Sequence, residues 1–185
     1  MEIFDLATTL ISIIIGIGLT EMFGNLHRLI RNRARVRWDW LPVVWATVLL
    51  TLVVNYWWAI YQGIVGIDKL GSAAELGLVL IQPIVMFLLL ASVLPSFAAD
   101  RRWDMPRYYE EHRRTFIATF LVYQCVTAAV ALVVGTWGWN PASLIRTLIV
   151  LLLVMTLVFN TRRWDWIGSI GILAGLLFRL TTQAA

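Results

Sequence analysis

An acidic side chain inside a long apolar segment is the clearest candidate for chemistry in this sequence. Glu21 lies within Gly-Leu-Thr-Glu-Met-Phe-Gly, in a run of mostly apolar residues. A charge in hydrocarbon costs roughly 2.5–3.5 kcal/mol on insertion scales, so such residues are often functional. Asn25 and Arg28 follow at helical spacings and share its face. Glu21 could serve as an ion or proton site, or it could form a structural hydrogen bond or ion pair with a neighbouring helix.

A second face of the same segment carries small and polar side chains. On a helix these residues fall within about 80° of one another, and they are Asp5, Thr9, Ser12, Gly16, Thr20 and His27. Small residues let helices approach closely in lipid, so this face could be a site of close packing. It could also line a path for a solute. The two possibilities differ in whether water reaches the face.

Polar residues of other segments are expected together in the outer half of the bilayer. Asn55 and Gln82 lie at similar depths in two different apolar segments, and Gln82 precedes a proline that favours a kink. We therefore expect a polar pocket between these helices. Arg146 lies near the same level and could pair with Asp5, or it could extend to the lipid headgroups. Arg179 lies at a similar level in the last segment.

Signatures of enzymes, metal centres and nucleic-acid binding are weak. The two histidines, His27 and His112, belong to separate segments, and Cys125 is the single cysteine, which excludes an intrachain disulfide and a thiolate metal site. No Gly-x-Ser-x-Gly motif or Walker loop is present. The aromatic run 56–58 with Tyr61 could stack a quinone, pigment or cation, or it could belong to the interfacial aromatic belt. The sequence therefore favours a protein without enzymatic activity or nucleic-acid ligand, and it identifies no cofactor.

Composition places these residues in a membrane. Of 185 residues, 60% are hydrophobic and only 14% are charged, whereas soluble domains carry about 25% charged residues. A bilayer span needs about 20 mainly apolar residues. Six segments qualify, namely 4–27, 41–62, 75–98, 115–137, 142–160 and 165–181. We predict a single all-α transmembrane domain over residues 1–185, an integral membrane bundle of about six helices arranged as three antiparallel hairpins.

The basic residues indicate the direction of these helices. The loops after the first, third and fifth segments carry 12 of the 15 Lys and Arg residues. Short cytoplasmic loops retain such charges, so both termini are expected outside the cytosol, facing the periplasm of a bacterial cytoplasmic membrane. Anionic lipid headgroups are the expected partners of the charges. Interfacial tryptophans agree, with Trp38, Trp40, Trp103, Trp164 and Trp166 on the cytosolic side and Trp137 and Trp139 on the outer side.

An Arg-Trp-Asp sequence recurs before each even-numbered segment, with copies that begin at Arg37, Arg102 and Arg163. The recurrence could reflect duplication of a two-helix unit, which would give a pseudo-threefold arrangement. Alternatively, three loops could meet the same needs, with Arg obeying the charge rule, Trp at the interface and Asp capping the next helix. In the second loop, Glu110 is expected to pair with Arg113 and Arg114 on a helix that extends above the bilayer.

Two functions are compatible with these features. The chain could form a small oligomeric channel or transporter for an ion or small solute, with Glu21 as the embedded polar site. It could instead be an accessory or assembly subunit of a larger membrane complex, without activity of its own. We therefore expect either a homo-oligomer or a larger complex. The candidate pathway residues are Glu21, Asn25, Asp5, Ser12, Thr20, Asn55, Gln82 and Arg146.

Overall fold

The computed structural model describes residues 2–63, 73–96, 103–133, 135, 138 and 141–184. In this part of the chain the fold is all-helical, as the sequence predicts. The six α-helices are α1 (Glu2–Arg31), α2 (Trp40–Tyr61), α3 (Ala73–Ser92), α4 (Met105–Val133), α5 (Pro141–Phe159) and α6 (Arg162–Ala184). Each overlaps one of the six predicted apolar segments, although α3 ends at Ser92, before the predicted end at residue 98. Helix α4 begins well before residue 115, as expected for a helix that continues beyond its apolar part.

Short elements connect the helices at one end of the bundle. A 3₁₀ turn (Arg33–Arg35) follows α1 and leads into β1 (Val36–Arg37). Strand β1 pairs in parallel with β2 (Trp103–Asp104), which immediately precedes α4. This pairing joins the loop before α2 to the loop before α4.

Two aspartates of the recurring sequence cap helices, as one of the two explanations of that sequence expects. The Asp39 carboxylate accepts a hydrogen bond from the backbone N–H of Leu41 at 3.1 Å, at the start of α2. The Asp104 carboxylate accepts from the N–H of Arg107 at 3.1 Å, at the start of α4. The first N–H groups of a helix lack partners within the helix, so these side chains satisfy them. Both helix starts are therefore encoded locally.

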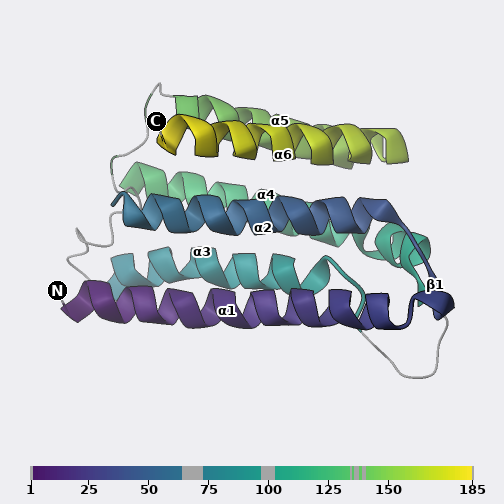
Figure 1. Ribbon diagram of the computed structural model, residues 1–185. Helices are drawn as coiled ribbons and strands as arrows, with labels where there is room; N and C mark the ends of the chain where they lie inside the picture. The colour runs from purple at the N-terminus through teal and green to yellow at the C-terminus, as the bar shows by residue number, and fades with distance from the viewer. Residues whose placement is uncertain are drawn as a thin grey trace.

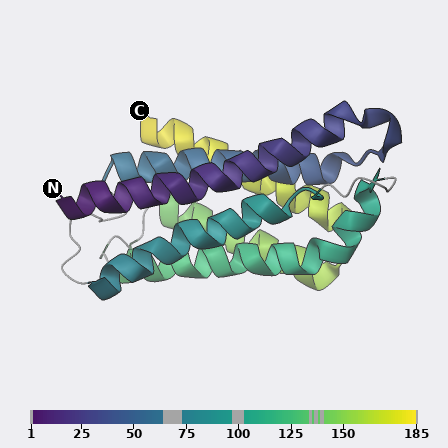
Figure 2. The same cartoon turned by 90° about the horizontal axis from the view of Figure 1, so that it is seen from below.

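The six helices lie side by side in three layers of two (Figure 1). Helices α1 and α3 form one outer layer, α2 and α4 the middle layer, and α5 and α6 the other outer layer. Helices α2 to α6 pack in a ring, which is closed by a weaker contact between α2 and α3. Helix α1 packs chiefly against α3. Helix α1 thus lies outside the ring. Both chain termini lie at the same end of the bundle (Figures 1 and 2).

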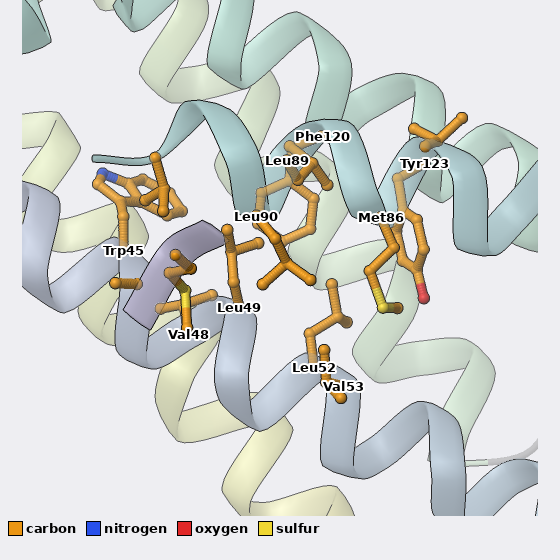
Figure 3. Packing of buried hydrophobic residues seen from close by; sticks show 14 of the residues in the cluster. Trp45, Val48, Leu49, Leu52, Val53, Met86, Leu89, Leu90, Phe120 and Tyr123 are labelled. Carbon is orange, nitrogen blue, oxygen red and sulfur yellow. The ribbon is translucent and has the colours of Figure 1, made fainter. Parts of the chain in front are cut away.

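Apolar side chains from α2, α3 and α4 fill the space between these helices (Figure 3). Trp45 of α2 is fully buried, and its ring meets Phe116 of α4 edge-on at a centroid distance of 5.3 Å. The indole N–H of Trp45 donates to the Tyr109 hydroxyl at 3.0 Å. The one polar atom of the indole is therefore satisfied inside an apolar environment, and α2 is linked to α4.

Three helical segments in the described part of the chain are long and apolar enough to span a membrane: Asp5–Arg31, Trp40–Tyr61 and Met105–Val133. Helices α3 and α5 contain shorter apolar stretches, Val79–Ser92 and Ser143–Phe159. Soluble proteins seldom expose extensive apolar surface. Here large apolar side chains face outward from all six helices, among them Ile17, Val54, Leu88, Val122, Leu151 and Phe178. These features indicate that the protein resides in a membrane.

Candidate functional site

A cavity of about 60 Å³ lies among α2, α3, α4, α5 and α6. Five helices contribute polar groups to its lining, namely Asn55, Tyr56, Gln82, Tyr123, Gln124, Thr127, Arg146 and Arg179. Asn55 is near the end of α2, Arg146 near the start of α5, and Arg179 near the end of α6. The cavity therefore belongs to the half of the bundle that holds the chain termini. The structure brings Asn55, Gln82 and Arg146, which the sequence placed at a shared depth, around one space.

Gln82 joins α3 to α4 at the cavity wall. Its Nε2 donates to the Tyr123 hydroxyl at 3.3 Å and to the Thr127 hydroxyl at 3.1 Å. The Thr127 hydroxyl in turn donates to the backbone carbonyl of Tyr123 at 2.8 Å. Gln82 and Tyr123 are both buried. Because a buried donor without a partner is costly, this network fixes the two helices relative to each other.

Asn55 joins α2 to α6 on the opposite wall. Its Nδ2 donates to the backbone carbonyl of Thr51 at 3.0 Å and to that of Leu176 at 3.2 Å. Its Oδ1 is buried without a hydrogen-bond partner, and so is the hydroxyl of the adjacent Tyr56. Both residues line the cavity. Buried polar atoms without partners are rare in folded proteins and call for an explanation such as a bound water or ligand.

Two arginines bring positive charge to this space. Arg146 and Arg179 are half-buried and line the cavity from α5 and α6. The Nε of Arg179 is buried without a hydrogen-bond partner. No carboxylate belongs to the lining formed by the described residues. Asp5, which the sequence offered as a partner for Arg146, lies instead on the exposed surface of α1.

The size of the cavity restricts what it can hold. One water molecule needs roughly 10–15 Å³ of such volume. About 60 Å³ therefore accommodates roughly four or five waters, or a polar group with a similar number of heavy atoms. The lining can surround one small polar group on several sides.

Glu21 lies apart from this cavity. Its side chain is exposed on the surface of α1, whereas Asn25 is buried. The Nδ2 of Asn25 donates to the Glu21 carboxylate at 3.1 Å, so the two residues share a face as the spacing predicts. Because α1 packs chiefly against α3, outside the helix ring, Glu21 faces outward from the single chain.

The small and polar face of α1 is exposed as well. Asp5, Ser12 and Thr20 all face outward. The Ser12 hydroxyl donates to the carbonyl of Thr8 at 2.6 Å and the Thr20 hydroxyl to that of Gly16 at 2.8 Å, so both are satisfied within the helix. In the single chain no described helix packs closely on this face at Gly16. The close approach of α1 to α3 occurs elsewhere, at Gly18.

Arg113 forms a buried polar cluster at the end of the bundle opposite the termini. Its Nε donates to the Asp165 carboxylate at 2.8 and 2.7 Å. Its terminal nitrogens donate to the Asn160 side chain and to the Thr156 carbonyl. The expected pairing of Arg113 with Glu110 is therefore wrong, because Arg113 points inward toward α5 and α6 while Glu110 is exposed.

Two more ion pairs lie at this end. Arg37 Nη1 is 3.3 Å from Asp104 Oδ2, across the β1–β2 pairing. Arg162 Nη2 is 2.5 Å from Asp39 Oδ2. All three aspartates of the recurring Arg-Trp-Asp sequence thus pair with an arginine from another part of the chain.

The tryptophans of the recurring sequence differ in exposure. Trp38 and Trp40 are exposed, and Trp40 shows 68% of its surface. Trp164 and Trp166 are half-buried, and Trp164 stacks on Phe159 at a centroid distance of 4.7 Å. The side chain of Trp103 and the residues Trp137 and Trp139 lie outside the described part.

Sequence reasoning missed the contribution of α4 to the cavity. Tyr123, Thr127 and Ala131 follow one another at intervals of four, which places them on one helical face. That spacing was a usable signal in the sequence. Among the described residues, no cluster of His, Cys, Asp or Glu could hold a metal ion.

Comparisons of the chain with protein families, curated proteins and solved structures find no match.

Proposed function

We propose that this chain is a six-span membrane protein that binds a small polar solute in the cavity among α2 to α6, as part of a channel or transporter. The observation that carries the proposal is the cavity itself. It combines groups from five helices with buried polar atoms that lack partners, Asn55 Oδ1 and the Tyr56 hydroxyl. Ligand sites in helical bundles are typically built this way, from side chains on facing helices.

Packing supports six spans. Three segments meet the length and apolarity of a span by themselves. The other three helices lie alongside them with similar extent (Figure 1), and they bury the polar residues Gln82, Thr156, Asp165 and Ser169. Backbone groups of a helix are satisfied internally, so a less apolar helix such as α6 is tolerated inside such a bundle.

The charge distribution supports the orientation. The end of the bundle with the Arg-Trp-Asp loops carries most of the basic residues, and both termini lie at the opposite end (Figure 2). Under the positive-inside rule the loop end is cytosolic. The cavity then lies in the outer half of the membrane, on the periplasmic side if the host is a bacterium, and anionic lipids contact the basic loops.

Cysteine accessibility tests the proposed solute site. Cys125 is exposed on the surface of α4, and Thr127 lines the cavity two residues later. Thiols react as thiolates, which form readily only where water is present. We expect Thr127→Cys, in a Cys125→Ser background, to react with a membrane-impermeant, negatively charged thiosulfonate added from outside.

Native Cys125 is the matched control at nearly the same depth, and it should stay unmodified because it faces lipid. Ala131→Cys provides a second cavity position on the same helix. If both cavity cysteines are as inert as Cys125 in folded, monodisperse protein, the cavity is closed to water and the proposed site is wrong.

The exposed polar face of α1 favours a second candidate function. A carboxylate that faces hydrocarbon is costly, and an apposed protein helix would relieve that cost at Glu21. The chain would then be an accessory subunit that docks on a larger membrane complex through α1. Native mass spectrometry of gently extracted protein separates the candidates. A stoichiometric larger partner supports the subunit, and a homo-oligomer free of other chains supports the channel or transporter.

A further inference from the structure

The polar atoms around the cavity that lack partners do not all need the same kind of partner. Among the described residues of the lining these atoms are the Oδ1 of Asn55, the hydroxyl of Tyr56 and the Nε of Arg179, and each is buried without a hydrogen bond. The amide oxygen can only accept a hydrogen bond, and the Nε–H can only donate one. The hydroxyl can do either. A group that satisfies all of them must both donate and accept.

The orientation of the Asn55 amide is set by its neighbours. Its Nδ2 donates to the backbone carbonyls of Thr51 and Leu176. A carbonyl oxygen accepts hydrogen bonds and cannot donate one, so exchanging the oxygen and nitrogen of the amide would place Oδ1 against two acceptors. Oδ1 therefore keeps its position and needs a hydrogen-bond donor.

These mixed requirements disfavour small ions as ligands. A carboxylate has acceptors only, so it would leave Asn55 Oδ1 without a donor. An ammonium ion or a guanidinium ion has donors only, so it would leave the Nε of Arg179 without an acceptor. Leaving a buried polar atom unpaired costs more than one hydrogen bond typically contributes. The requirements are met by an uncharged group that has both donors and acceptors.

We infer that the cavity binds the uncharged amide group of a small solute, which donates to Asn55 and accepts from Tyr56 and Arg179. A primary amide carries its donor nitrogen and its acceptor oxygen on different atoms, so it can meet residues of α2 and α6 at once, whereas a single hydroxyl must meet both from one oxygen. The volume of about 60 Å³ holds roughly four or five waters, which suits an amide with one small substituent. This inference rests on the proposed solute site and names the chemistry of its ligand.

A matched series of small molecules tests the inference. Acetamide, acetate, acetamidinium and 2-propanol are similar in size, and each has a methyl signal for saturation-transfer NMR. Acetamide donates and accepts, acetate only accepts, acetamidinium only donates, and 2-propanol does both through one hydroxyl. Each is titrated onto the whole chain in deuterated detergent, with empty micelles as the blank. We expect acetamide to bind about 10-fold more tightly than either ion, the effect of one buried polar atom left unpaired, and several-fold more tightly than 2-propanol.

Two substitutions assign the bound amide to the cavity. Tyr56→Phe should weaken acetamide binding several-fold and leave unliganded stability unchanged, because the hydroxyl has no partner in the free protein. Arg179→Lys replaces the Nε–H by a methylene and keeps the positive charge, and it should weaken binding about 10-fold. Tyr61→Phe and Arg114→Lys make the same exchanges at exposed positions and should bind acetamide normally. Tyr56→Phe keeps the test decisive if Arg179→Lys fails to fold.

Equal or tighter binding of acetate, acetamidinium or 2-propanol overturns the inference, and so does acetamide binding that both cavity variants leave unchanged. Binding of no probe also overturns it, because the cavity would then hold water alone. Labelling of Thr127→Cys separates this inference from the proposed function. If that cysteine reacts but acetamide does not bind through Tyr56 or Arg179, the solute site stands and its ligand is not an amide. If the cysteine is inert as well, the proposed function fails with it.

Discussion

Arg113 of α4 and Asp165 of α6 form an ion pair in which Nη2 lies 2.7 Å from Oδ1, and both side chains are more than nine-tenths buried. The guanidinium also donates to the Asn160 side chain and the Thr156 carbonyl, near the end of α5. One side chain thus holds three helices together at the end of the bundle remote from the cavity.

Three of the ion pairs at this end connect the three Arg-Trp-Asp copies in a circle. Arg37 of the first copy pairs with Asp104 of the second. Arg113, in the helix that follows the second copy, pairs with Asp165 of the third. Arg162, the residue before the third copy, pairs with Asp39 of the first. The arginines occupy different positions relative to their own copies, so the contacts do not repeat with threefold symmetry.

Breaking the buried pair should be far more damaging than breaking an exposed one. Arg113→Ala leaves the Asp165 carboxylate buried without its partner, and we expect the free energy of unfolding to fall by about 3–5 kcal/mol. Arg107→Ala removes an exposed pair with Glu111 and should leave the free energy of unfolding nearly unchanged. Reversible unfolding in mixed micelles measures both. Equal losses would show that burial of Arg113 has no energetic consequence.

The contact between α1 and α3 depends on a glycine. A Cβ at Gly18 would lie 2.9 Å from Leu90 Cδ1 and 3.3 Å from the backbone Cα of Phe87. Gly18→Ala should therefore reduce the free energy of unfolding by about 1–3 kcal/mol. A Cβ at Gly16 meets nothing within 4 Å, so Gly16→Ala should be neutral or stabilising by up to about 1 kcal/mol. The same unfolding assay compares them, and a reversed order would contradict the packing.

The helices were predictable because long apolar segments determine them, and Asp39 shows that even a helix start can be anticipated. The partner of each helix was not predictable in the same way. Short loops favour hairpins of sequential helices, yet α1 packs chiefly against α3. That choice depends on the fit of Gly18 against Leu90, which is visible only once both helices are placed.

The candidate site was predictable in part for a similar reason. Depth along a helix follows from counting residues, so Asn55, Gln82 and Arg146 could be placed at one level. The direction in which a helix turns its polar face depends on its neighbours. Glu21 was therefore predicted to be an embedded polar site, although it faces outward from the single chain. Thr127 was not predicted to belong to a site, although it lines the cavity.

Neutralising Glu21 should leave the single chain intact. In Glu21→Gln the amide oxygen can still accept from Asn25 Nδ2, and the side chain is exposed. We expect stability within about 0.5 kcal/mol of the wild type and unchanged labelling of Thr127→Cys. Thermal unfolding and thiol labelling check this. If the substitution abolished labelling with the fold preserved, access to the cavity would involve the outer face of α1.

The orientation of the bundle can be tested on one helix. Thr182 and Arg163 are both exposed and lie at opposite ends of α6, the helix whose span is least apparent from apolarity. The positive-inside rule places the Arg163 end in the cytosol. In a Cys125→Ser background, we therefore expect Thr182→Cys to react with an impermeant maleimide in intact cells, and Arg163→Cys to react only after permeabilisation. The opposite pattern would invert the bundle and place the cavity in the cytosolic half. Reaction of both cysteines in intact cells would show that α6 does not cross the membrane, and a six-span arrangement would then be wrong.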